Sequence, residues 1–313
     1  MKRKVADQVE DMKKQTFGVE IEMAEITRKK VVNTVAEYFK TTSTVHYEGG
    51  NYRTWYCKDK NGRTWRVMSD ASIVSSSESA ELVTPILNYS DMADLQEITR
   101  KLRHAGAVSN PKYGCGLHVH IGAQGHTAQT LRNLVNIMAS HERLIKEALK
   151  LDGDRVRKYC RMVDPIFLSK VNSIKPKTME RFADVWYTSH YATYGRNNRY
   201  NDSRYHMLNL HATFTKGTVE FRLFQFDNPT VYRKGGLHAG QLKSYIQLCL
   251  ALSQMAKEVR SASAKPQQNQ NPKYAMRTWL LRLGFIGEEF KTAREILTKN
   301  LSGDAAFRHS RSA

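Results

Sequence analysis

Three short stretches of the chain combine side chains that could hold a metal ion or a phosphate group. In each, two polar residues flank one apolar residue: Glu20-Ile21-Glu22, His118-Val119-His120 and Glu220-Phe221-Arg222. Side chains alternate between the two faces of a β-strand, so the polar pair of each stretch would share one face. Taken singly, each stretch also fits an ordinary sheet, as a solvent-facing edge strand, a structural histidine pair or a surface ion pair.

Two further carboxylates, Asp70 and Glu81, fall at strand ends and extend the set. Carboxylate oxygens in this number suit Mg²⁺ or Mn²⁺ better than zinc. Several carboxylates around metal ions, with an arginine nearby, form a set that could support phosphoryl transfer from ATP. The chain has neither a Walker motif nor a GxGxxG loop, so any nucleotide would have to bind on the sheet itself.

The elements that would position these residues can be predicted from hydrophobic periodicity and turn chemistry. Strands are expected at 16–24, 81–84 and 117–123. Hairpins are expected for 55–58 with 64–67, across Asn61-Gly62, and for 207–214 with 218–226. Helices are expected at 30–39, from Ser90 or Asp91 to 104, at 127–149, 237–259, 273–283 and 287–300, with short helices and loops over 150–205. Tight turns make antiparallel strands, so this order predicts an α+β fold with helices on one face of an antiparallel sheet.

Composition narrows the class of protein. The 313 residues carry a formal net charge of +19, which favours anionic partners such as nucleotides, nucleic acids or acidic substrates. A merely solvated basic surface is the alternative. No apolar run approaches the roughly 20 residues that span a bilayer, so no membrane association is expected. The four scattered cysteines form no CxxC pair and fit a reducing cytoplasm.

Several motifs, in this order, resemble the amidoligase family of the carboxylate–amine ligase superfamily, which includes glutamine synthetase and glutamate–cysteine ligase. They are FGVEIEM, SDASI followed by ELVTPIL, CGLHVHIG and LNLHATFTKGTVEFRLF, within residues 16–258. A serine-rich run between Asp70 and Glu81 departs from the family pattern. The resemblance implies a glutamine-synthetase-like curved antiparallel sheet whose concave face holds metals and ATP.

The resemblance also implies roles for individual residues. Metal ligands would be Glu20, Glu22, Asp70, Glu81, His118 and Glu220. His120 would lie at the nucleotide or metal, and Arg222 would contact the γ-phosphate. Arg199 and Arg204, in an arginine-rich stretch, would hold phosphate or a substrate carboxylate, Arg199 as a catalytic group and Arg204 at the nucleotide. Asn209 and His211 would support the ligands from the same face of the 207–214 strand.

The predicted function is an ATP- and Mg²⁺-dependent (or Mn²⁺-dependent) ligase that joins a carboxylate to an amine through an acyl phosphate. Its substrates would be of amino-acid, peptide or cell-wall type. Two alternatives remain: a metal-dependent hydrolase built on His118 and His120, and a basic nucleic-acid-binding protein without catalysis. The excess of carboxylates over histidines argues against the hydrolase. Acids in a nucleic-acid groove would repel phosphate, which argues against the nucleic-acid-binding protein. The expected organisation is a polar leader (1–15), a catalytic domain (16–259), a linker (260–272), and C-terminal helices with a polar tail (273–313).

Overall fold

The computed structural model describes residues 5–74, 78–228, 236–266 and 270–307. The serine-rich run, the expected linker, the leader and the tail each extend partly outside these ranges. The chain divides into two compact units. We call 16–120 with 223–243 the sheet unit, and 1–15 with 121–222 and 244–313 the helical unit.

The strands form one sheet of eight in the order β2-β3-β4-β5-β1-β6-β8-β7, and the strand pairs whose register is defined are antiparallel. This confirms the predicted α+β class. Their bounds are β1 Phe17–Ala24, β2 His46–Gly49, β3 Thr54–Lys58, β4 Thr64–Met68, β5 Ser79–Val83, β6 Leu117–Gly122, β7 Leu208–Asn209 and β8 Thr218–Phe224.

The hairpin of β3 and β4 forms as predicted across Asn61-Gly62. Gly62 has a φ of 76°, a left-handed conformation that glycine adopts without steric cost. The turn is reinforced by the buried Asp59 carboxylate, which accepts hydrogen bonds from the backbone N–H groups of Asn61 and Arg63 and from the indole N–H of Trp65. The hairpin therefore has both the local turn signal and a buried anchor.

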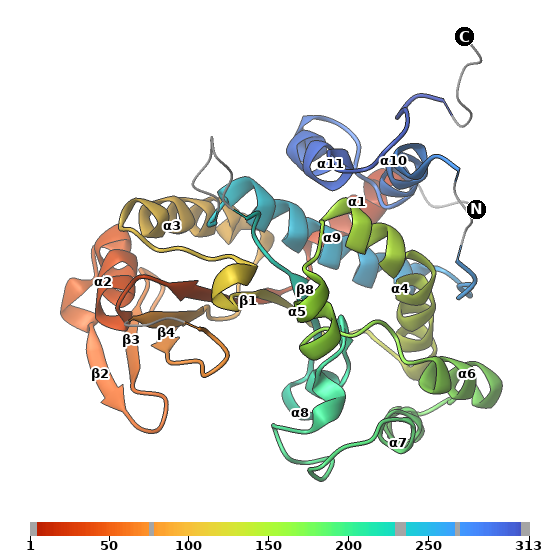
Figure 1. The fold of residues 1–313 in the computed structure, drawn as a ribbon, viewed down its shortest axis with the longest axis horizontal. Helices are drawn as coiled ribbons and strands as arrows, with labels where there is room; N and C mark the ends of the chain where they lie inside the picture. Colours follow the sequence, from red (N-terminus) through yellow and green to blue (C-terminus); the bar gives the residue numbers. More distant parts are fainter. Residues whose placement is uncertain (1–4, 75–77, 229–235, 267–269, 308–313) are drawn as a thin grey trace. The chain divides into compact units, whose positions relative to one another are not determined.

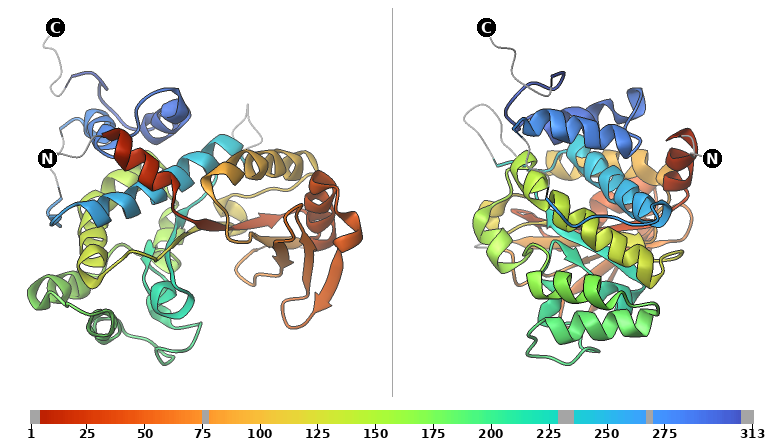
Figure 2. Two further views of the ribbon diagram at one scale, coloured as in Figure 1. Left: turned by 180° about the vertical axis from the view of Figure 1, so that it is seen from behind. Right: turned by 90° about the vertical axis from the view of Figure 1, so that its right-hand side faces the viewer.

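Two helices of the sheet unit, α2 (Arg28–Phe39) and α3 (Met92–His104), pack against each other, and α2 lies on β3, β4 and β5. Figures 1 and 2 show these helices beside the strands. The apolar side of α2, which includes Val31 and Val35, is buried, as are the alternate residues Val19, Ile21 and Met23 of β1. The alternation leaves Glu20 and Glu22 on the other face of β1.

The helical unit contains most of the helices, and Figure 1 labels its longer ones. Aromatic rings pack against one another in this unit: Trp279 stacks on His141 with ring centroids 3.9 Å apart, and Phe167 meets Trp186 edge-on at 4.8 Å. The helices are α1 Val5–Lys13, α4 Ala128–Ala148, α5 Gly153–Lys158, α6 Pro165–Ile174, α7 Met179–Ser189, α8 His211–Lys216, α9 Ala239–Glu258, which begins in the sheet unit, α10 Pro272–Arg282 and α11 Lys291–Thr298.

Most predicted helices are confirmed within a few residues, but two local details differ. A 3₁₀ helix, Tyr89–Asp91, precedes α3, and Asn88 and Asp91 form a capping box around it. Asp91 is the N-cap of α3, as expected, but its side chain makes no capping hydrogen bond to that helix. At the other end of the chain, α1 falls within the expected polar leader, and its Met12 is buried. None of the described helices is long and apolar enough to cross a lipid bilayer.

Candidate active site

The two carboxylates of β1 are held in different ways. Glu22 is only 3% exposed, and its Oε2 accepts a hydrogen bond of 2.5 Å from the backbone N–H of Gly116. Its own backbone N–H donates to the Gly116 carbonyl at 3.2 Å, so two hydrogen bonds join Glu22 to Gly116. Glu20 is half-buried. The strand therefore presents one fixed and one more accessible carboxylate on the same face.

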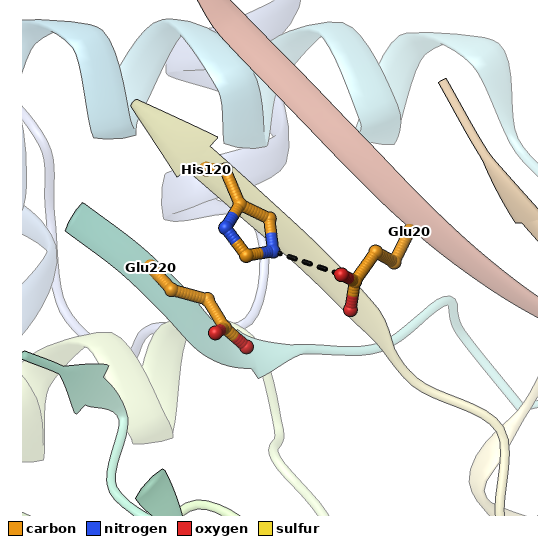
Figure 3. Close-up of side chains that lie close together, drawn as sticks. All are labelled: Glu20, His120 and Glu220. Carbon is orange, nitrogen blue, oxygen red and sulfur yellow. Dashed lines mark ion pairs between the residues drawn. The ribbon is translucent and has the colours of Figure 1, made fainter. Parts of the chain in front are cut away.

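Both histidines of β6 contact these carboxylates. His118 Nδ1 lies 2.9 Å from Glu20 Oε2, and its Nε2 lies 3.5 Å from Glu22 Oε1. His120 Nε2 lies 3.2 Å from Glu20 Oε1, an ion pair that Figure 3 marks with a dashed line. Glu220, also labelled in Figure 3, comes from β8 and belongs to the helical unit. The predicted glutamate pair and histidine pair thus lie together in the sheet unit.

Strand β5 adds a third glutamate to this face. In the register of β1 with β5, Glu81 stands directly opposite Glu22, and both are buried. Asp70 follows the end of β4, and its Oδ1 accepts a 2.6 Å hydrogen bond from the backbone N–H of Ser72. These residues form two overlapping groups whose donor atoms all lie within 4.8 Å of one another: Glu20 with Glu81 and His118, and Glu22 with Asp70 and Glu81.

The donor set fits a hard divalent cation. Two buried carboxylates directly opposite each other on neighbouring strands repel, which destabilises the pair unless positive charge lies between them. The groups supply mainly carboxylate oxygens with one imidazole, the composition that Mg²⁺ or Mn²⁺ accepts and that a thiolate-rich zinc site lacks. Glu20, Glu22, Asp70, Glu81 and His118 are therefore the residues that would hold such an ion.

In the helical unit, Glu220 and Arg222 of β8 form a buried pair. Arg222 Nη1 donates to Glu220 Oε1 at 2.6 Å, and Asn209 Nδ2 donates to Glu220 Oε2 at 2.8 Å. Both carboxylate oxygens are thereby held, and the supporting role of Asn209 stays a prediction. Asn209 Oδ1 also accepts from the backbone N–H of Ala212 at the start of α8.

Comparison with known families agrees with this arrangement of motifs. A family model described as "putative amidoligase enzyme" matches residues 13–253. The chain belongs to the amidoligase family. No curated protein shows significant sequence similarity to it.

One expectation about this amidoligase is wrong. The predicted strand over 207–214 stops at Asn209, and residues His211–Lys216 form the helix α8. Gly217, with a φ of 69°, ends the helix in a left-handed conformation, and its N–H donates to the Ala212 carbonyl. His211 is thus not on a strand face with Asn209. Its Nδ1 instead lies 2.7 Å from the Tyr187 hydroxyl, and burial lowers the pKa of this histidine.

The two arginines of the arginine-rich stretch lie outside regular strands. Arg199 is exposed in the loop after α7, and Arg204 is half-buried in the short 3₁₀ helix Asp202–Arg204. Arg204 Nη1 donates to the Arg199 carbonyl at 3.1 Å. Their roles at phosphate, nucleotide or substrate stay predictions.

Sequence reasoning overlooked Arg155, a buried arginine in α5. Its Nη2 donates to the backbone carbonyl of Arg222 at 3.1 Å, so it holds the strand at the Glu220-Phe221-Arg222 stretch. It also overlooked Gly116, whose backbone N–H holds Glu22. No local pattern marks Arg155, because its partner is 67 residues away in the chain.

Proposed function

We propose that this amidoligase is an ATP- and Mg²⁺-dependent carboxylate–amine ligase that works through an acyl phosphate. The observation that carries the proposal is the clustering of Glu20, Glu22, Glu81 and His118 on three neighbouring strands of the sheet unit. Carboxylates converge in this way where a cation must hold the phosphates of a nucleotide. Membership of the family supports the formation of an amide bond.

The reaction has two steps. A carboxylate oxygen of the first substrate attacks the γ-phosphorus of ATP, and the bond to the β,γ-bridging oxygen breaks, which releases ADP and gives an acyl phosphate. The amine nitrogen of the second substrate then attacks the acyl carbon. Phosphate leaves, the nitrogen loses a proton, and an amide remains. Phosphorylation is needed because oxide is a poor leaving group.

Within this scheme the residues of the chain have distinct tasks. A bound Mg²⁺ or Mn²⁺ would neutralise phosphate charge. Glu22 is fixed by the Gly116 N–H, and His118 orients Glu20 through its Nδ1, so the carboxylates are held in place before a ligand arrives. The family motif assigns Arg222 to the transferring phosphoryl group, and its guanidinium is held by Glu220.

We propose substrates of the amino-acid, peptide or cell-wall type and a cytoplasmic location. The location is supported by the four cysteines, which are all buried and free, as expected in a reducing compartment. Nucleic acid is not favoured as a partner, because the carboxylates that converge in the sheet unit would repel phosphate that no cation neutralises.

The test is ADP release from ATP and Mg²⁺ with pooled carboxylates and amines, with mass spectrometry of the products to detect new amides. Glu20→Ala and Arg222→Ala should each lower release at least ~100-fold. Glu37→Ala on α2 and Arg260→Ala after α9 remove the same charges at exposed positions and should leave release unchanged. Circular dichroism checks that all four variants fold. Unchanged turnover in both Glu20→Ala and Arg222→Ala, or amide hydrolysis that needs no ATP, would contradict the proposal.

A further inference from the structure

Arginine and tyrosine side chains alternate in a continuous series within the helical unit. The Arg222 guanidinium lies 5.9 Å from the ring centroid of Tyr205, and the Arg204 guanidinium lies 5.1 Å from the same ring. Arg204 also lies 5.7 Å from the ring of Tyr200, and Arg199 lies 5.0 Å from that ring. We call these five residues the Arg–Tyr ladder. Cation–π contact of this kind fixes a guanidinium over a ring face.

The ladder runs from the interior of the unit to its surface. Arg222 is 7% exposed, Arg204 and Tyr205 are half-buried, Tyr200 is 42% exposed, and Arg199 is exposed. A ligand in solution could therefore reach the outer guanidinium first. One ring separates each guanidinium from the next: Tyr200 lies between Arg199 and Arg204, and Tyr205 lies between Arg204 and Arg222.

The middle of the ladder carries a positive charge that no carboxylate among the described residues pairs with. Among the described residues, the half-buried Arg204 contacts two tyrosine rings and a backbone carbonyl and forms no ion pair with a carboxylate. Two acids of the same unit interact with other groups: Asp202 Oδ2 accepts the Thr193 N–H at 2.6 Å, and Asp184 pairs with Arg196 at 3.1 Å. A desolvated cation without a counter-charge is a natural place for an anion to bind.

A second arginine beside the ladder adds to this charge. Arg161 is exposed, and its guanidinium donates at 3.3 Å to the backbone carbonyls of Tyr205 and Asp202. Its side chain thus holds the backbone on both sides of Arg204. No described carboxylate pairs with Arg161 either, so the positive field around Arg204 is strengthened and not cancelled.

The chemistry of the rungs suits carboxylates. A guanidinium whose face lies on a ring keeps its N–H edge for a carboxylate fork. The innermost rung already makes this bond, because Arg222 holds the Glu220 carboxylate at 2.6 Å. Each of the two rings is contacted by two guanidinium groups, which leaves less ring face for stacking by a nucleic-acid base. The series therefore matches a chain with repeated carboxylates better than single-stranded nucleic acid.

We infer that the Arg–Tyr ladder binds an acidic peptide segment, whose carboxylates engage Arg199 and Arg204. The role of that peptide as the carboxylate substrate rests on the proposed ligase function. The inference narrows the substrate from amino acids in general to chains with several side-chain carboxylates. It also assigns Arg199 and Arg204 to the substrate, whereas the sequence motif had assigned Arg204 to the nucleotide.

The test is fluorescence-polarisation binding of labelled hexa-L-glutamate to the full chain, without ATP or metal. The wild type should bind, and binding should weaken as salt is raised. Arg199→Ala and Arg204→Ala should each weaken binding about 10-fold, the effect of losing about 1.4 kcal/mol. Arg260→Ala removes the same charge from an exposed position of the unit and should change binding less than twofold. Because Arg199 is exposed, its replacement leaves the fold intact even if the Arg204 variant does not fold.

A ten-nucleotide oligothymidine provides the competing arm. Hexaglutamate binding that is equal in the wild type and Arg199→Ala overturns the inference, as does binding of the oligonucleotide alone in a manner that depends on Arg199. The two proposals fail separately. ADP release with small carboxylates but no hexaglutamate binding would overturn the ladder alone. Ladder-dependent binding without any ADP release would overturn the ligase alone.

Discussion

Replacing Glu81 with glutamine should stabilise the metal-free sheet unit and remove its response to divalent cations. Glu22 and Glu81 face each other across β1 and β5, with donor atoms within 4.8 Å. At an effective dielectric constant of about 20, two unit charges at that distance repel by about 3 kcal/mol. Since a glutamine N–H can donate to the Glu22 carboxylate, we expect a net gain of about 1–3 kcal/mol.

The assay is amide hydrogen exchange of peptides from β1 and β5, which reports local opening in each unit separately. In EDTA, the Glu81→Gln amides should exchange about 5- to 100-fold more slowly than the wild type. In MgCl₂ at about 100 times the dissociation constant, the wild type should gain about 2.7 kcal/mol and the variant much less. Glu37→Gln, at an exposed position of α2, should behave as the wild type. Faster exchange of Glu81→Gln in EDTA, or an undiminished response to Mg²⁺, would refute the reasoning.

Two further outcomes follow from the structure. A Cβ on Gly114, whose φ is 75°, would lie 2.5 Å from the Ser72 carbonyl oxygen. Gly114→Ala should therefore lower the free energy of unfolding in urea by about 1–3 kcal/mol. It should also weaken Mn²⁺ binding measured by calorimetry, because it displaces the turn that holds Asp70. Burial raises the pKa of Glu142 from 4.5 to about 7, partly offset by the Val163 N–H. The folded state therefore holds a proton that the unfolded state loses, so the free energy of unfolding falls as pH rises from 4.5 to 7. In urea unfolding, Glu142→Gln should be more stable than the wild type by about 3 kcal/mol above pH 7 and equal to it near pH 4.5. Equal stability of the two proteins at pH 8 would contradict this.

The sequence by itself determined most elements and the residue types of the site. Alternation in β1 placed Glu20 and Glu22 on one face, and Asn61-Gly62 specified the β3–β4 turn, because both signals depend only on neighbours along the chain. The ordered motifs also led to the amidoligase family, which the family model confirms. These inferences succeeded because period and turn chemistry are local properties.

The tertiary structure decided which of these residues meet. Nothing local specifies that Glu22 stands opposite Glu81, or that the Gly116 N–H holds Glu22, because strand order and register depend on contacts between distant segments. The same limit explains the wrong strand after Asn209. The alternating pattern there is compatible with a strand. The hydrogen bond from the Ala212 N–H to Asn209, the bond of His211 to Tyr187 and the left-handed Gly217 together favour a helix. The sequence is sufficient to identify the side chains of the candidate site, whereas contacts between distant segments determine which groups hold those side chains in place.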